Sequence, residues 1–143
     1  VAATKAALAE GIVAGGGVTL VNLAGGLKVS GADSIAAGRQ ILKDALKQPF
    51  LQIMRNAGLN ADALLAQVEA SKAGFGVNVM KPENELVDVK KAGVIDPARV
   101  TKEAVQNAVS IASTAATMGA LVVDVPEPEA PAAPGGMPGM GMM

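Results

Sequence analysis

The segment Glu10-Gly11-Ile12-Val13-Ala14-Gly15-Gly16-Gly17-Val18-Thr19-Leu20 decides how this chain can fold. Its three consecutive glycines separate two apolar, alanine-rich stretches that both have helical periodicity. Glycine accepts positive φ without a steric cost, but inside a helix it costs about 1 kcal/mol relative to alanine. The glycines therefore indicate a flexible corner between helices, or a place where a ligand or another backbone contacts bare main chain. The local sequence favours the corner, because it matches neither common glycine-rich phosphate motif.

The composition indicates a chain of about one domain with an unusual core. The chain has 143 residues, 17% of them charged, and a net charge of −1, so no nucleic-acid partner is expected. Only Phe50 and Phe75 are aromatic, which leaves the packing to alanine, valine, leucine and methionine. Small side chains bury little apolar surface each, and we expect the chain to need a partner surface for stability.

Several kinds of chemistry are excluded by residue type. The chain has no cysteine and no histidine, which removes disulfides, thiolate nucleophiles, ordinary zinc sites and imidazole bases. We predict no metal ligands, and a cytoplasmic location, because no secretion signal is present. Residues 11–27 and 104–123 are uncharged and long enough to raise the alternative of a small membrane protein. Their glycine and polar residues argue against lipid contact, so no membrane partner is expected.

Helical periodicity and capping residues predict most of the chain as helix. Asp33 or Ser34 caps one predicted helix, Pro49 opens the next at its first turn, Gly58 ends that helix, and Asn60 caps the following one. Asp96-Pro97 has the pattern of an N-cap followed by proline at the first helical position. The predicted helices cover residues 2–10, 18–24, 35–46, 49–57, 61–70 and 97–118, the last with Val100, Ala104, Ala108, Ile111, Ala115 and Met118 on one face.

Glycine and β-branched residues predict a small amount of β structure. Residues 74–79 and 86–89 form a predicted strand pair, and residues 121–125 a C-terminal edge strand that exposes unpaired backbone groups. Residues 126–143 are rich in proline, glycine and methionine and cannot form a packed element. The predicted fold class is mainly α, with a small β-hairpin and an edge strand. The edge strand and the exposed apolar helix faces predict self-association.

Six motifs taken in order resemble the C-terminal portion of a GroEL-type group I chaperonin. They are Ala3-Thr4-Lys5-Ala6-Ala7, Glu10 to Val18, Gly74-Phe75-Gly76-Val77-Asn78, Gly93-Val94-Ile95-Asp96-Pro97, Val100-Thr101-Lys102 and the Gly-Met terminus. The resemblance implies the end of an intermediate-domain helix at residues 1–10, the second half of an ATP-binding equatorial domain at residues 11–125, and a disordered tail at residues 126–143.

The resemblance also implies a function and site residues. The family forms ATP-driven double rings of identical subunits, whose cavity closes over unfolded client proteins under a co-chaperonin lid. Its nucleotide contacts fall at Gly16, at Asn78, Val79 and Met80, and at Asp96. Gly16 would leave bare backbone to the nucleotide, Asn78 and its neighbours would offer amide and main-chain groups to the adenine, and Asp96 would accept hydrogen bonds from the ribose.

Two of these residues also have a purely structural interpretation, since Asp96 can cap a helix and Asn78 can satisfy turn backbone. Val79 and Met80 replace the small residues usual in the family, so their expected contacts are through main chain. The family's catalytic aspartate would lie upstream of Val1, and its phosphate loop and metal-binding aspartate belong to the other half of the domain. The resemblance therefore implies ATP or ADP with Mg²⁺ for a longer chain, and no turnover by this one. The alternative is a subunit-assembly module whose glycines serve packing.

Overall fold

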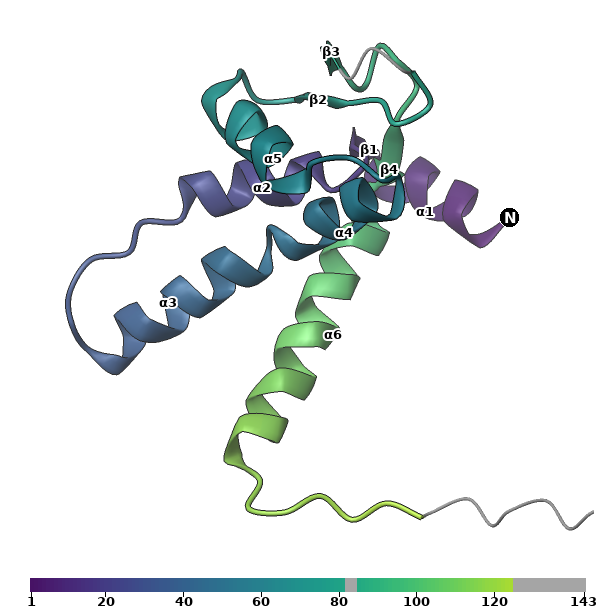
Figure 1. Ribbon diagram of the computed structural model, residues 1–143. Helices are drawn as coiled ribbons and strands as arrows, with labels where there is room; N and C mark the ends of the chain where they lie inside the picture. Colours follow the sequence, from purple (N-terminus) through teal and green to yellow (C-terminus); the bar gives the residue numbers. More distant parts are fainter. Residues whose placement is uncertain (82–84, 125–143) are drawn as a thin grey trace, which may run out of the picture.

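The computed structural model describes residues 1–81 and 85–124, which form six helices and four short strands (Figure 1). Three helices, α2, α4 and α5, gather around one core, and α3 and α6 extend away from it. In chain order the elements are α1 (Ala2–Glu10), β1 (Ile12–Ala14), α2 (Val18–Gly26), α3 (Ser34–Ala45), α4 (Gln48–Asn56), α5 (Ala61–Ala70), β2 (Phe75–Val77), β3 (Leu86–Asp88), β4 (Ile95–Pro97) and α6 (Ala98–Thr117).

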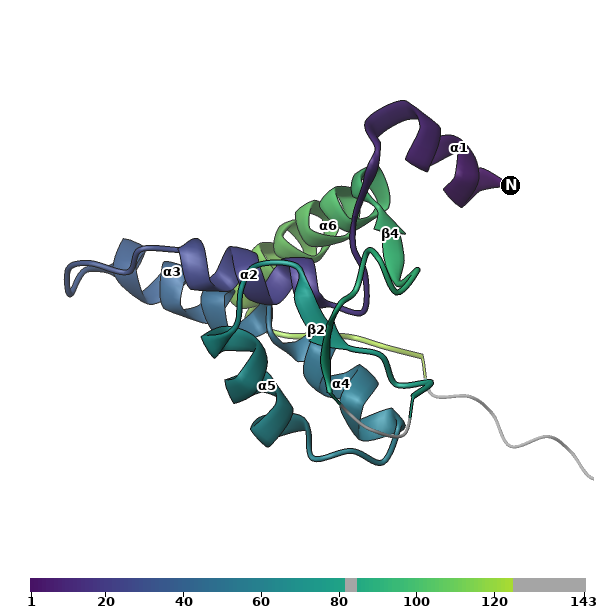
Figure 2. The same cartoon turned by 90° about the horizontal axis from the view of Figure 1, so that it is seen from above.

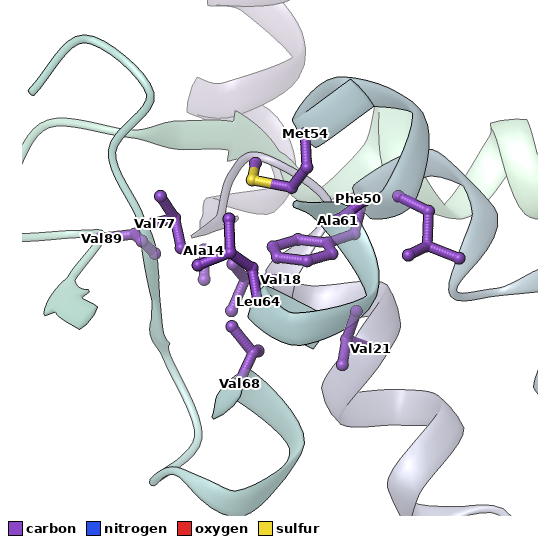
Figure 3. Close-up of a cluster of buried hydrophobic side chains, with 11 residues drawn as sticks. Ala14, Val18, Val21, Phe50, Met54, Ala61, Leu64, Val68, Val77 and Val89 are labelled. Carbon is purple, nitrogen blue, oxygen red and sulfur yellow. The ribbon is translucent and has the colours of Figure 1, made fainter. Parts of the chain in front are cut away.

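The core is centred on Phe50, whose side chain is fully buried (Figure 3). Met54 lies one turn along α4, and Val18 and Val21 from α2 and Val68 from α5 close around them. The core thus depends on one aromatic ring surrounded by aliphatic side chains, as the composition predicts. The whole cluster is Ala14, Val18, Val21, Phe50, Leu51, Met54, Ala61, Leu64, Val68, Val77 and Val89.

Local helix signals are confirmed where the sequence predicts them. The Asp33 side chain accepts a hydrogen bond from the Ala36 amide, and the Asn60 side chain accepts one from the Ala63 amide. Each bond satisfies an amide of the first turn, which has no partner within its own helix. Pro49 lies in the first turn of α4, and Gly58 follows the end of that helix with a φ of 72°.

The predicted hairpin is present as β2 and β3, which pair antiparallel with Phe75 opposite Asp88 and Val77 opposite Leu86. Gly76 lies in the middle of β2, and a Cβ there would come 2.3 Å from a methyl group of Val18. Glycine therefore lets the hairpin lie directly on α2. The prediction of strands at residues 74–79 and 86–89 is confirmed, with shorter strands than expected.

A second strand pair corrects two predictions. The predicted corner between helices contains β1, which pairs antiparallel with β4, with Val13 opposite Asp96. Asp96 is therefore a strand residue and not the N-cap of the last helix. That helix, α6, begins at Ala98 with Pro97 in the cap position and no capping side-chain hydrogen bond. The Asp-Pro pattern was misleading because its aspartate belongs to a ladder with a strand more than 80 residues earlier.

The helices α3 and α6 diverge from the core like the arms of a V (Figure 1). None of the 20 residues of α6 is buried. Ile35 and Ile41 of α3 are 61% and 70% exposed. Ile111 of α6 is 71% exposed, so this part of the predicted apolar face is not covered by the described chain.

The predicted edge strand is not formed over residues 121–124, which belong to no strand and are exposed. Its last residue, Val125, lies outside the described residues, as does the predicted disordered tail at residues 126–143. Hydrogen bonding to a second strand defines a strand, and the described chain offers residues 121–124 no such partner. In the described part of the chain, no helix is both long and apolar enough to span a bilayer.

Candidate nucleotide-binding site

The three glycines turn the chain from β1 into α2, and the first of them is held against another backbone. The Gly15 amide donates a hydrogen bond to the Val94 carbonyl at 3.0 Å. A Cβ at Gly15 would lie 2.9 Å from the Ile95 nitrogen, closer than real side chains approach backbone. Gly15 is therefore required by packing against the segment that enters β4. Figure 2 shows the chain between α1 and α2 running alongside β4.

Gly17 is required for a different contact. It is the N-cap residue of α2, with a φ of 80°, and a Cβ there would lie 2.8 Å from both the Cα and the nitrogen of Phe50. The bare backbone of Gly17 lets α2 and α4 approach closely at the centre of the core. The side chain of Thr19 fastens the same turn, because its hydroxyl donates to the Ala14 carbonyl at 2.8 Å.

Gly16, between them, differs from both. Its φ of 64° is left-handed, yet the atom nearest to a Cβ built there is a methyl carbon of Val94 at 3.6 Å, which is ordinary contact. No backbone atom from elsewhere in the described chain lies within 4 Å of that Cβ. Of the three glycines, Gly16 is thus the one whose main chain stays open to a ligand, with the side chain of Val94 beside it.

Asp96 belongs to the same unit as Gly16. It lies on β4 opposite Val13, and its neighbour Ile95 supplies the backbone that contacts Gly15. The residue is half-buried. The ladder between β1 and β4 therefore brings a carboxylate and the open glycine backbone to one small region, although the two residues are far apart in the sequence.

Asn78 follows the last residue of β2 and begins a turn. Its side-chain oxygen accepts a hydrogen bond from the Met80 amide at 3.0 Å, and its carbonyl accepts one from the Lys81 amide. The structural interpretation of Asn78 as a turn residue is therefore confirmed. Its side-chain NH₂ group is left as the donor that could face a ligand. Val79 and Met80 in the same turn are 39% and 87% exposed.

The core connects the predicted site residues to one another. Ala14 and Val18, on either side of the glycines, pack in one cluster with Val77, which precedes Asn78, and with Val89 (Figure 3). Val94 packs against this cluster as well. Gly16 and Asp96 thus belong to one backbone unit, in which β1 pairs with β4 and Gly15 contacts Ile95. Asn78 is attached to this unit through the core, and Val79 and Met80 lie in an exposed turn. The sequence analysis missed Val94 as a neighbour of Gly16, although its motif contains the residue.

An ion pair fastens α1 to the beginning of α6, next to β4. It joins Lys102 of α6 to Glu10 of α1, with 2.5 Å between Nζ and Oε2. Arg99 and Glu103, four residues apart within α6, form a second ion pair at 2.7 Å. The hydrogen bond and charge of Arg99 lower the pKa of Glu103. The same hydrogen bond and the charge of Glu103, with a smaller effect from Glu10, raise the pKa of Arg99. Both pairs are solvent-exposed.

Comparison with known proteins shows which family the chain belongs to. The sequence model of the TCP-1/cpn60 chaperonin family matches residues 1–125. This chain belongs to that family. It is 42% identical over 140 residues to "Chaperonin GroEL 1" of Prochlorococcus marinus strain MIT 9215, and 42% identical over 137 residues to the protein of the same name in strain MIT 9312. These alignments cover 96% and 94% of this chain and 23% of each relative.

A solved structure shares the fold. The crystal structure of a group III chaperonin in the open state superimposes with a TM-score of 0.72 and 27% sequence identity, over 82% of this chain and 25% of that one. The resemblance to a chaperonin deduced from the motifs is therefore confirmed. The chain spans about a quarter of the length of the relatives it matches, so it corresponds to a part of a chaperonin.

Proposed function

We propose that this chain is the C-terminal part of an ATP-dependent chaperonin and forms one wall of its nucleotide site. The observation that carries this proposal is the difference among the three glycines. At Gly15 and Gly17, neighbouring backbone occupies the space where a Cβ would lie. At Gly16, whose backbone is left-handed, no other main chain of the described residues lies in that space. Packing against backbone explains the first two glycines, whereas at Gly16 only the left-handed φ calls for glycine, and the space beside its backbone is left for a ligand.

The residues fit the nucleoside end of ATP or ADP. Gly16 would let the nucleotide lie against bare backbone, and the NH₂ group of Asn78 and the main chain of Val79 and Met80 would face the adenine. The carboxylate of Asp96 would accept hydrogen bonds from the ribose hydroxyls. The side chain of Val94, at ordinary contact distance from Gly16, supports the proposal by giving the site an apolar surface.

The phosphate end needs groups that these residues do not supply. Phosphoryl transfer requires positioned phosphates, Mg²⁺ and an oriented water together. We propose that those groups lie on the part of a full-length chaperonin outside these 143 residues, and that this chain alone does not turn over ATP. In the full-length protein, bound nucleotide would drive client folding in a double ring of identical subunits, closed by a co-chaperonin, in the cytoplasm.

The test compares Gly16→Val with Gly58→Val in a full-length chaperonin that carries this segment. Both glycines have left-handed φ, 64° and 72°, and neither has backbone where a Cβ would be, so the two substitutions strain the chain similarly. We expect Gly16→Val to weaken ATP binding at least about tenfold with ring assembly retained, because the new side chain occupies the space of the ligand. Gly58→Val should leave ATP affinity unchanged. Equal affinities in the two variants would contradict the nucleotide role.

A subunit-assembly module without nucleotide binding is the second candidate, and the unburied α6 favours it. The same experiment separates the two. In an assembly module, Gly16→Val would reduce ring formation, measured by sedimentation velocity, while any nucleotide affinity of the remaining monomer stayed unchanged. The two roles are compatible, because the open face of Gly16 and the open face of α6 belong to different parts of the fold.

A further inference from the structure

The proposed nucleotide site has two parts, the glycine turn and the β2–β3 hairpin, which main-chain hydrogen bonds connect. The Gly15 amide donates to the Val94 carbonyl at 3.0 Å, and the Val94 amide donates to the Val89 carbonyl at 2.8 Å. The Val89 amide in turn donates to the carbonyl of Gly74, the residue before β2, at 3.1 Å. The backbone of two valines in the segment between β3 and β4 therefore joins the two parts of the site.

Packing fixes both valines in place. Val89 is fully buried, and one of its methyl groups lies 3.1 Å from the position of a Cβ built at Gly76 of β2. Val94 packs against the core cluster, with a methyl group 3.6 Å from a Cβ built at Gly16. These contacts lie inside the described chain and belong to its core, so the connection does not depend on a face that the chain leaves open.

Asp88 closes the turn that leads from one part of the site to the other. It is the last residue of β3, opposite Phe75, and its Oδ1 accepts a hydrogen bond from the Lys91 amide at 3.2 Å. Its carbonyl accepts a second bond, from the Ala92 amide at 2.9 Å. Residues 90–93 are exposed, so hydrogen bonds and not burial hold this turn. The Lys91 ammonium lies 3.8 Å from Oδ2 on an 86% exposed side chain, so the bond to the amide, and not this ion pair, is the main contribution of Asp88.

We propose that Asp88 is a positioning residue of the nucleotide site, which holds Asn78 in place relative to Gly16. It does not contact the ligand. It lies at the end of the hairpin that carries Asn78 and at the start of the turn that leads to Val94. If that turn is loose, the hairpin and the glycine turn can move relative to each other, and a nucleotide that spans both must order them when it binds. This inference rests on the proposed roles of Gly16 and Asn78 in nucleotide binding.

The test removes the side-chain bond of Asp88 in a full-length chaperonin that carries this segment. Asp33→Ala is the matched control, because the Asp33 Oδ1 also accepts a bond from an amide three residues later, but at the start of α3. Titration calorimetry with ADP and Mg²⁺, which are not turned over, gives the dissociation constant. We expect Asp88→Ala to raise it about three- to tenfold, the range of one hydrogen bond. Asp33→Ala should leave it unchanged, and equal dissociation constants in the two variants would overturn the proposal.

Two further substitutions of Asp88 separate the hydrogen bond from the charge. Asp88→Asn keeps an acceptor oxygen without the charge, so the dissociation constant should stay at the wild-type value. Asp88→Glu keeps the charge but moves the acceptor by one methylene, and it should raise the dissociation constant at least about twofold even if Asp88→Ala fails to assemble. An Asp88→Asn variant that binds as weakly as Asp88→Ala would assign the effect to the charge and contradict positioning by this bond.

A double-mutant cycle with Asn78→Ala tests whether Asp88 acts through the hairpin. A general loss of stability would add to the effect of Asn78→Ala, whereas a positioning residue has little left to position once the Asn78 side chain is removed. We therefore expect Asp88→Ala to change the dissociation constant less than about twofold in the Asn78→Ala background, and additive effects would overturn the proposal. Gly16→Val in the same assay separates this inference from the proposed function. If only Gly16→Val weakens binding, Asp88 has no positioning role, and if neither variant does, the proposed function fails as well.

Discussion

The helices around Phe50 and the pair formed by α3 and α6 use their apolar side chains in opposite ways. At most 1% of the surface of Phe50, Met54 and Val68 is exposed, whereas Ile41 and Ile111 are about 70% exposed. Both regions have capped or well-defined helices and similar residue types. The difference shows that an amphipathic pattern gives a helix an apolar face. That face becomes part of a core only when a second element packs on it.

The comparison also bears on the proposed nucleotide site of this chaperonin segment. The glycine turn is attached to the buried region, where the backbones of Ile95 and Phe50 lie against Gly15 and Gly17. The helices α3 and α6 instead extend away from that region (Figure 1). The proposed site thus lies on the part of the fold that the core holds in place, as a ligand site requires.

The largest expected effect comes from truncating one side chain in each region. Phe50→Ala should lower the free energy of unfolding by about 3–5 kcal/mol, because it leaves a cavity at the centre of the core. Ile111→Ala, which removes an apolar side chain of comparable type from α6, should change it by no more than about 0.5 kcal/mol. Urea titrations of the two variants measure both changes. A similar loss in the two variants would mean that α6 is covered in solution.

A smaller effect is expected from substituting two glycines that have the same backbone φ but different surroundings. Gly11 and Gly17 have φ values of 81° and 80°, yet a Cβ would meet nothing within 4 Å at Gly11 and the Phe50 backbone at Gly17. Gly11→Ala should cost about 1–2 kcal/mol, the price of a left-handed residue. Gly17→Ala should cost roughly 1–3 kcal/mol more, because α4 must move away from α2. Thermal unfolding of the two variants side by side gives the difference, and equal melting temperatures would refute the close contact.

The sequence was sufficient to predict the structure wherever the signal is local. Asp33 and Asn60 each accept a hydrogen bond from an amide three residues later, and Pro49 suits the first turn of its own helix, so their effects follow from the residue types alone. The hairpin was also predictable, because its two strands are close together in the sequence. The motifs then supplied the family, although the family itself, and no local chemistry, pointed to Gly16, Asn78 and Asp96.

The pairing of β1 with β4 could not be predicted in this way. Each strand has three residues, too few to show alternation, and the partners are separated by most of the chain. Asp96-Pro97 resembles a helix start because aspartate and proline suit both an N-cap and the end of a short edge strand. Nor could the sequence distinguish the three glycines, since the backbones that fill Gly15 and Gly17 come from Ile95 and Phe50.

The smallest expected effect concerns the ion pair that joins Lys102 of α6 to Glu10 of α1. None of the residues of α1 is buried, and the helix packs on α6 and β4. Exposed ion pairs contribute at most about 1 kcal/mol, so Lys102→Ala should leave global unfolding almost unchanged. It should instead reduce the hydrogen-exchange protection of residues 2–10, because α1 can detach without unfolding the core. Lys72→Ala, on the loop before β2, is the control.

The ion pair of Arg99 and Glu103 within α6 gives the first turns of that helix a pH dependence, whose sign is fixed by the lowered pKa of Glu103. A carboxyl group with a lower pKa in the folded state stabilises that state above its ordinary pKa, and the contribution disappears as the pH falls through the lowered value. Protection in the first turn of α6, corrected for intrinsic exchange rates, should therefore be constant near neutral pH and decrease below about pH 4.5. In Glu103→Gln that decrease should be smaller, because the side chain paired with Arg99 then has no carboxyl group to titrate. If the variant keeps the full acid dependence, Glu10 or another carboxylate controls the fraying of α6, and the pair of Arg99 and Glu103 contributes nothing measurable to it.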